Sequence, residues 1–99
     1  MIVHIVMWKL KPEVQNRDEA LQRIGKALEG LPGEIAQIKG FEVGVPNLSA
    51  SPAGFDISLY SRFDSLDDLE SYRVHPEHQK VAELIQSLTG ERAVVDYQA

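Results

Sequence analysis

The stretch that decides the fold is Tyr72-Arg73-Val74-His75-Pro76-Glu77-His78, because its proline breaks a helical region in two. A proline disfavours the helical conformation for the residue before it but fits the first position of a helix. The pattern therefore predicts a bend at His75 and a new helix that begins at Pro76. The stretch also holds two of the three histidines of the chain, so it marks a place where chemistry could occur.

Helical patterns continue on both sides of this break. Ser65, followed three residues later by Asp68, is typical of a helix start. Beyond the proline, apolar residues recur every three or four positions and form one stripe with His78 at its head, near the start of the helix. The members of this stripe are His78, Val81, Ile85 and Leu88. An earlier helix is predicted from the Asn16 and Glu19 pair up to a stop at residues 31–33, Leu-Pro-Gly.

Four segments have the composition of strands. Residues 2–10 are apolar on both alternating faces, so this strand needs cover on both sides. Residues 38–45 and 55–63 alternate between apolar and polar positions, and residues 93–97 form a last strand that follows a helix end at Thr89-Gly90. Residues 46–54 combine proline, glycine, serine and asparagine, which is typical of an exposed loop.

The predicted order is β-α-β-β-α-β, which favours a ferredoxin-like α+β sandwich with one four-stranded antiparallel sheet. Helices can cover only one face of that sheet. The other face is most simply covered by a second copy of the chain, so that two sheets pack as a dimeric α/β barrel. The alternative is a monomer whose second face is only locally apolar.

Length and charge limit the range of functions. With 99 residues the chain is predicted to form a single domain over residues 1–99. Its net charge of -5 argues against nucleic acid and anionic membranes as partners. The absence of cysteine excludes disulfides and thiolate chemistry and fits a cytoplasmic location. Residues 1–8 are too few to span a membrane.

Several segments together resemble the stress-responsive dimeric α/β-barrel (Dabb) family. They are His4 on the first strand, Lys9-Leu10-Lys11, the strand from Gly54 to Phe63 that enters Asp64-Ser65, the Tyr72 to His78 stretch, and Val94-Val95-Asp96-Tyr97. The resemblance covers nearly the whole chain. It implies the fold and the homodimer that the patterning predicts, but it implies a function much less directly, because most members of the family have no established activity and some are stress-accumulated stable proteins.

One plant member is a polyketide cyclase that works without a cofactor, and its catalytic tyrosine and histidine match Tyr72 and His78. Its pocket histidine on the first strand matches His4. The resemblance thus implies that His78 acts as a base and that the Tyr72 hydroxyl holds a substrate oxygen, which suits the closure of a carbonyl compound. We accordingly expect a small pocket for an apolar or aromatic carbonyl ligand, lined by His4, Val6, Trp8, Leu59 and Val81.

Two departures from the cyclase argue against the same substrate. The cyclase lines its pocket with aromatic residues of the first helix, where this chain has residues 23–27, Arg-Ile-Gly-Lys-Ala, and another pocket histidine is replaced by Ile57. Trp8 projects toward the same space as His4, and its bulk could fill much of a cavity.

A structural interpretation of the same residues remains open. A histidine at a helix start often bonds a carboxylate or a backbone carbonyl, and Asp96 is an available partner for His78 or His4. His75 resembles a capping or hinge residue more than a catalyst. The residues do not favour a metal or another cofactor, since no third ligand joins His75 and His78 by spacing. The protein would then be a barrel with a purely structural or stress-protective role, whereas fold analogy suggests a cofactor-free monooxygenase-like enzyme.

Overall fold

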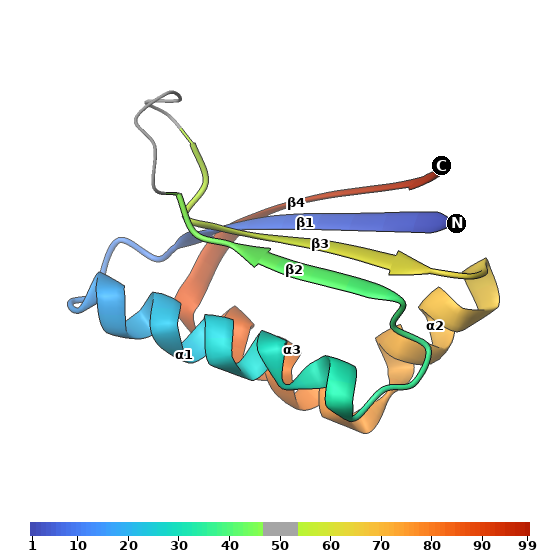
Figure 1. Cartoon of the computed structure of the whole chain (residues 1–99). Coiled ribbons are helices and arrows are strands. Elements are labelled where there is room, and N and C mark those ends of the chain that lie inside the picture. Colours follow the sequence, from blue (N-terminus) through green and yellow to red (C-terminus); the bar gives the residue numbers. More distant parts are fainter. Residues whose placement is uncertain (47–53) are drawn as a thin grey trace.

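The computed structural model describes residues 1–46 and 54–99 (Figure 1). The expected loop at residues 46–54 lies, apart from its two end residues, outside the described part. Along the chain the elements are β1 (Ile2–Leu10), α1 (Arg17–Glu29), a short 3-10 helix η1 (Leu31–Gly33), β2 (Gly40–Gly44), β3 (Ile57–Phe63), α2 (Leu66–Val74), α3 (Pro76–Leu88) and β4 (Thr89–Gln98).

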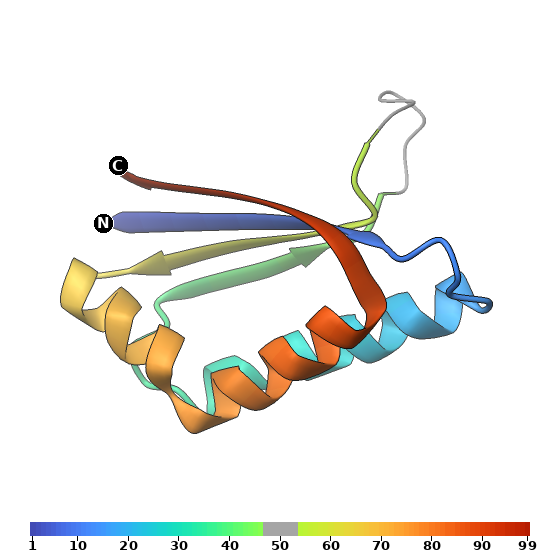
Figure 2. The same ribbon diagram turned by 180° about the vertical axis from the view of Figure 1, so that it is seen from behind.

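The strands form one antiparallel sheet in the order β2-β3-β1-β4. All three α-helices lie on one face of this sheet, and no helix or strand of residues 1–46 and 54–99 covers the other face (Figures 1 and 2). This arrangement confirms the predicted ferredoxin-like α+β fold. The two chain ends meet at one corner, where the backbone N–H of Ala99 donates to the carbonyl of Met1 over 2.9 Å.

The strand ends differ from the sequence prediction. β2 and β3 are shorter than the predicted ranges 38–45 and 55–63, and β4 is longer than the predicted range 93–97. β4 extends because it pairs with β1 along almost all of that strand, from Ile2 opposite Gln98 to Leu10 opposite Thr89. Thr89 is therefore both the C-cap of α3 and the first residue of β4. The pairing of β1 with β4 shifts its register between Lys9 and Leu10.

The predicted helix starts are confirmed by side-chain caps. Asn16 accepts a hydrogen bond from the backbone N–H of Glu19, and Ser65 accepts one from that of Asp68. His75 has an extended backbone and divides α2 from α3 at the predicted bend. A capped N-terminus satisfies backbone donors that would otherwise lack partners.

The core lies between the sheet and the helices. Alternate residues of β1 and β3 point toward the helix layer, where they meet Ile24 and Leu28 of α1 and Leu69 and Tyr72 of α2. Ile24 and Phe63 have no exposed surface at all. Among the described residues, no helix is long and apolar enough to cross a membrane.

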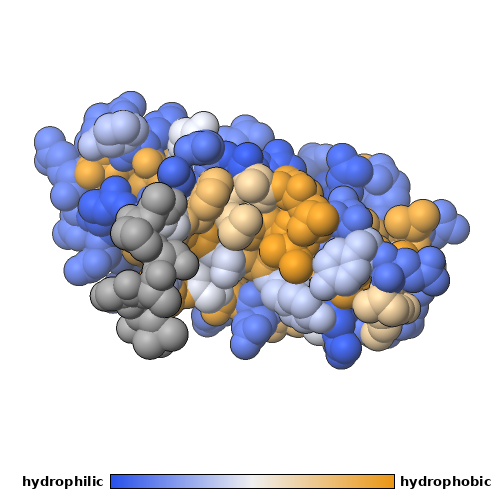
Figure 3. All heavy atoms as spheres, turned by 90° about the horizontal axis from the view of Figure 1, so that it is seen from above, coloured by the Kyte–Doolittle hydropathy of each residue, from blue (hydrophilic) through white to orange (hydrophobic). Residues whose placement is uncertain are grey.

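The uncovered face of the sheet is apolar along its middle. Tyr60, Ile5 and Val95 lie side by side across three strands, and Val3 faces Tyr97 in the next row. Val95 and Tyr97 keep about half of their surface exposed, at 50% and 46%. We call these five residues the outer patch; apolar side chains gather at the centre of this face (Figure 3).

The helix-facing core should dominate the stability of the isolated chain. We expect Ile24→Ala to lower the free energy of unfolding by about 2–5 kcal/mol, because it leaves a cavity at a fully buried site. The neighbouring Arg23→Ala changes an exposed residue of the same helix and should have almost no effect. Urea denaturation of both variants measures the difference, and equal stabilities would contradict this description of the core.

Candidate functional site

A cavity of about 280 Å³ lies between the sheet and the helices α2 and α3. His4, Val6 and Trp8 of β1 and Leu59 of β3 form its sheet side. Tyr72, at the end of α2, and His78, Val81 and Ile85 of α3 form much of its helix side. The bend at His75 thus brings Tyr72 and His78, which belong to different helices, to the same cavity.

Tyr72 is the most deeply set polar residue of the cavity. Its ring packs against Phe63 at 5.0 Å and Phe41 at 6.5 Å between ring centroids, and only 1% of the residue is exposed. Its hydroxyl has no hydrogen-bond partner among the described residues, yet no fully buried side-chain oxygen there is left unsatisfied. The hydroxyl therefore keeps access to the cavity. Burial raises the pKa of Tyr72 well above its usual range, so the hydroxyl stays protonated and can donate.

The ring of His78 is held in one tautomer by the backbone. Its Nδ1 lies 2.9 Å from the carbonyl oxygen of Arg73. Because a carbonyl oxygen can only accept, Nδ1 carries the proton, and in neutral His78 the lone pair is on Nε2. Burial lowers the pKa of His78 below its ordinary value of 6.5, although the Arg73 carbonyl acts in the opposite direction. His78 is therefore mainly neutral near pH 7, and its Nε2 can accept a proton.

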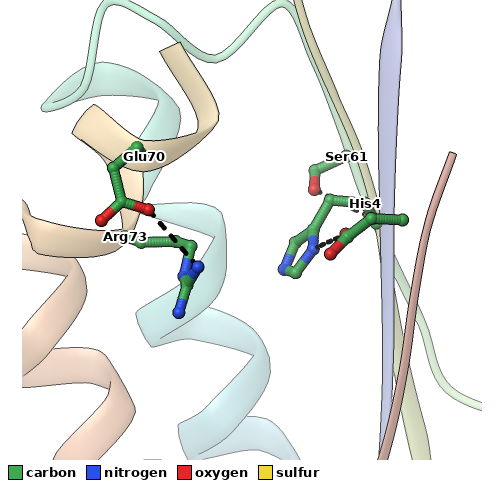
Figure 4. A network of polar contacts seen from close by, with 5 residues as sticks. His4, Ser61, Glu70 and Arg73 are labelled. Carbon is green, nitrogen blue, oxygen red and sulfur yellow. Dashed lines mark hydrogen bonds and ion pairs between the residues drawn. The ribbon is translucent and has the colours of Figure 1, made fainter. Parts of the chain in front are cut away.

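His4 is fixed on the opposite side by its neighbours in the sheet. Its Nδ1 donates to the carboxylate of Asp96 on β4, which lies directly opposite His4 in the strand pairing. The hydroxyl of Ser61 donates to the backbone carbonyl of His4 over 2.9 Å. The other ring nitrogen of His4 points away from the sheet toward α2 (Figure 4). Asp96, which the sequence offered to either histidine, is therefore the partner of His4.

Three rings form a row across the cavity, with Tyr72 in the middle. The ring centroids of Tyr72 and His78 are 4.4 Å apart, and those of Tyr72 and His4 are 6.3 Å apart. The row thus offers one protonated hydroxyl and two imidazoles to a common space. This combination suits the removal of a proton next to a carbonyl group while the carbonyl oxygen is held.

The structure also shows where the other predicted site residues lie. Val6, Trp8, Leu59 and Val81 line the cavity, and Trp8 leaves it open. His75 is not part of its wall; the Nδ1 of His75 accepts from the backbone N–H of Glu77 over 3.1 Å and caps α3. Across residues 1–46 and 54–99, no three His, Asp or Glu side chains come together as metal ligands.

Sequence reasoning missed the charged wall of the cavity. Glu70, Arg73 and Arg92 line it, and Arg73 and Glu70 form an ion pair of 3.3 Å. Arg92 lies opposite Trp8, on the same side of the sheet as Asp96, four residues before it on β4. The alternation of residues along the last strand indicates that Arg92 faces the same side as Asp96. The sequence prediction missed this because it started the strand at residue 93, after Arg92.

Comparison with known proteins places this chain among proteins of the same fold. The family model described as "Stress responsive A/B Barrel Domain" matches residues 2–99. A dimeric protein of unknown function with a ferredoxin-like fold from Bacteroides fragilis is 34% identical, with a TM-score of 0.88 over 99% of this chain and 95% of that one. No curated protein matches the chain.

Two more distant structures share the fold. The hydroxynitrile lyase of Passiflora edulis is 20% identical, with a TM-score of 0.82 over 97% of this chain and 90% of that one. An antibiotic biosynthesis monooxygenase is 18% identical, with a TM-score of 0.76 over 100% of this chain and 98% of that one. Proteins with this architecture therefore differ in activity. The match over residues 2–99 shows that the chain belongs to the stress-responsive A/B barrel domain family.

Proposed function

We propose that the protein binds a small apolar or aromatic carbonyl compound in the cavity and moves a proton on it without a cofactor. The observation that carries this proposal is the pairing of an unpartnered Tyr72 hydroxyl with a neutral His78 in one cavity. At about 280 Å³ the cavity is near the lower end of ligand pockets, which span about 300–1,000 Å³, so it suits one ring with small substituents.

The proposed step is proton abstraction next to the carbonyl. Nε2 of His78 takes the proton from the carbon beside the carbonyl, and the electron pair of that C–H bond moves into an enolate. The Tyr72 hydroxyl donates a hydrogen bond to the enolate oxygen as its negative charge develops. Return of the proton, or attack of the enolate on a second carbonyl of the same molecule, completes an exchange or a cyclisation.

The surroundings divide these roles between the two residues. Burial keeps Tyr72 protonated, so Tyr72 acts as the donor, and burial keeps His78 neutral, so His78 acts as the base. Apolar walls from Val6, Trp8 and Leu59 favour an apolar or aromatic substrate body. A lyase among proteins of the same fold is consistent with carbonyl chemistry in this architecture.

A structural role for the same residues is the second candidate. The close packing of Tyr72 against Phe41 and Phe63, and the bond from His78 to the Arg73 carbonyl, would both stabilise a barrel that binds nothing. The two candidates differ in what removal of one polar atom does. If the residues bind a substrate, removing the polar atom should abolish the proton transfer and leave the stability of the protein nearly unchanged. If the residues only support the fold, the same change should lower the stability alone.

We also propose that two copies pack through the outer patch. Covering the exposed members of this patch, Tyr60, Val95 and Tyr97, would contribute up to about 1.5–3 kcal/mol each, which is substantial for a domain of this size. An isologous pair is the commonest way to cover such a face. The Bacteroides fragilis neighbour, 34% identical, is described as dimeric.

Deuterium exchange into the methyl group of acetophenone tests the proton transfer. We expect the protein to accelerate this exchange in D₂O, and expect Tyr72→Phe and His78→Gln each to lower the acceleration by about a hundredfold. Proton NMR of the methyl signal measures the rate. Tyr60→Phe removes a hydroxyl on the other face of the sheet, and His75→Asn keeps a good helix cap; both should retain the activity.

The outcome separates the two candidate functions. If the wild-type protein leaves the exchange rate unchanged while His78→Gln lowers the melting temperature by several degrees, the framework role stands and the proposed chemistry fails. Thermal unfolding of each variant under the same conditions supplies the second measurement.

The exchange rate should depend on pH through His78. Only the neutral imidazole accepts a proton, so the rate rises with pH as His78 loses its proton and then levels off. Since the pKa of His78 is lowered, the midpoint of the rate profile should fall below 6.5, and the rate should level off at higher pH. A midpoint above 6.5 in the rate profile would show that another group is the base.

Sedimentation tests the dimer. We expect a dimer at micromolar concentration and expect Val95→Glu, at a half-exposed residue of the outer patch on β4, to yield a monomer, because a buried unpaired charge is costly. Leu66→Glu makes the same kind of change at a residue of α2 that is 67% exposed and should leave the dimer intact. A monomeric wild-type chain would refute the barrel.

A further inference from the structure

We propose that the ligand of the cavity carries a carboxylate and that Arg92, assisted by Arg73, binds it at the charged wall of the cavity. This inference deepens the proposed function and rests on it. It adds a second recognition element to the cavity, separate from the atoms that would act on the carbonyl group.

Arg92 is a cation of the cavity wall that has no partner among residues 1–46 and 54–99. It lies on β4 directly opposite Trp8, whose side chain forms the sheet side of the cavity. The part of the chain that the structure describes offers it no ion pair and no side-chain hydrogen bond. The guanidinium is a flat fork of donors that matches the two oxygens of a carboxylate.

Arg73 approaches the same cavity from the helix side. Its side chain extends from α2 into the space that the His4 ring faces (Figure 4). Its pair with Glu70 is exposed, with 62% and 61% of the two side chains accessible, and such pairs are weak. A ligand carboxylate could therefore share the Arg73 guanidinium with Glu70.

The charges around the cavity favour an anion although the chain as a whole is acidic. Arg73, Arg92 and Glu70 together leave one net positive charge at the wall. The other nearby carboxylate, Asp96, is engaged by His4. Besides burial, the charges of both arginines help to lower the pKa of His78, so both act on the interior of the cavity.

Arg92 lies beside Trp8, at the other end of the β1 wall from His4, and this separation gives the ligand a direction. The aromatic body would lie against Val6, Trp8 and Leu59, with its carbonyl at Tyr72 and His78 and its carboxylate at Arg92. A single excess positive charge fits one carboxylate better than a doubly charged phosphate. The substrate class is therefore a small aromatic or apolar keto acid.

A pair of ligands that differ only in charge tests this proposal. We expect 4-acetylbenzoate to bind the wild-type protein about tenfold more tightly than the neutral 4-acetylbenzamide, as measured by titration calorimetry near pH 8. Arg92→Gln should remove most of this preference while leaving the affinity for 4-acetylbenzamide unchanged. Arg92→Lys should restore part of it, and high salt should weaken it.

Arg23→Gln is the matched control, because it removes an exposed arginine of α1 that does not line the cavity. It should keep the full preference for the carboxylate. Equal affinity of the wild-type protein for the two compounds would overturn the inference and leave the proposed function standing. A preference that survives in both Arg92→Gln and Arg73→Gln would overturn it as well. A lack of saturable binding by either compound would count against the proposed function itself.

Discussion

The bend at His75-Pro76 is the constraint on which the rest of the site depends. In a continuous helix, Tyr72 and His78 would lie six residues apart along one axis, and that axis would cross the sheet in a single direction. The extended backbone of His75 instead ends α2 and starts α3 in a new direction. The cavity wall is therefore made by two helices that meet at an angle, and the carbonyl that α2 leaves free at Arg73 orients the His78 ring.

The site combines opposite effects of the same physical cause. Burial disfavours charge, so it holds a tyrosine in its protonated form and a histidine in its neutral form. The ring centroids of Tyr72, the donor, and His78, the base, are thus 4.4 Å apart, and yet Tyr72 does not pass its proton to His78.

Much of this arrangement could be predicted from the sequence, and the exceptions have physical reasons. Proline geometry and capping side chains act locally, which is why the starts of α1, α2 and α3 were predicted correctly. The composition of β1 identified the strand, and its inward residues define the sheet side of the cavity. The extent of β4 depends on pairing with β1, a long-range contact that no local pattern contains, and Arg92 was missed with it. The choice of Asp96 between two histidines likewise depends on strand register.

The contact between His4 and Asp96 joins residues that are 92 positions apart in the chain. β4 is made after β1 during synthesis, so one wall of the cavity stays without its outer strand until the residues of β4 are available. Contacts of such sequence separation are costly in chain entropy and tend to form late. The polar side of the cavity is therefore complete only once β4 has paired with β1, and a chain truncated before β4 would expose the edge of β1 and lack both Asp96 and Arg92.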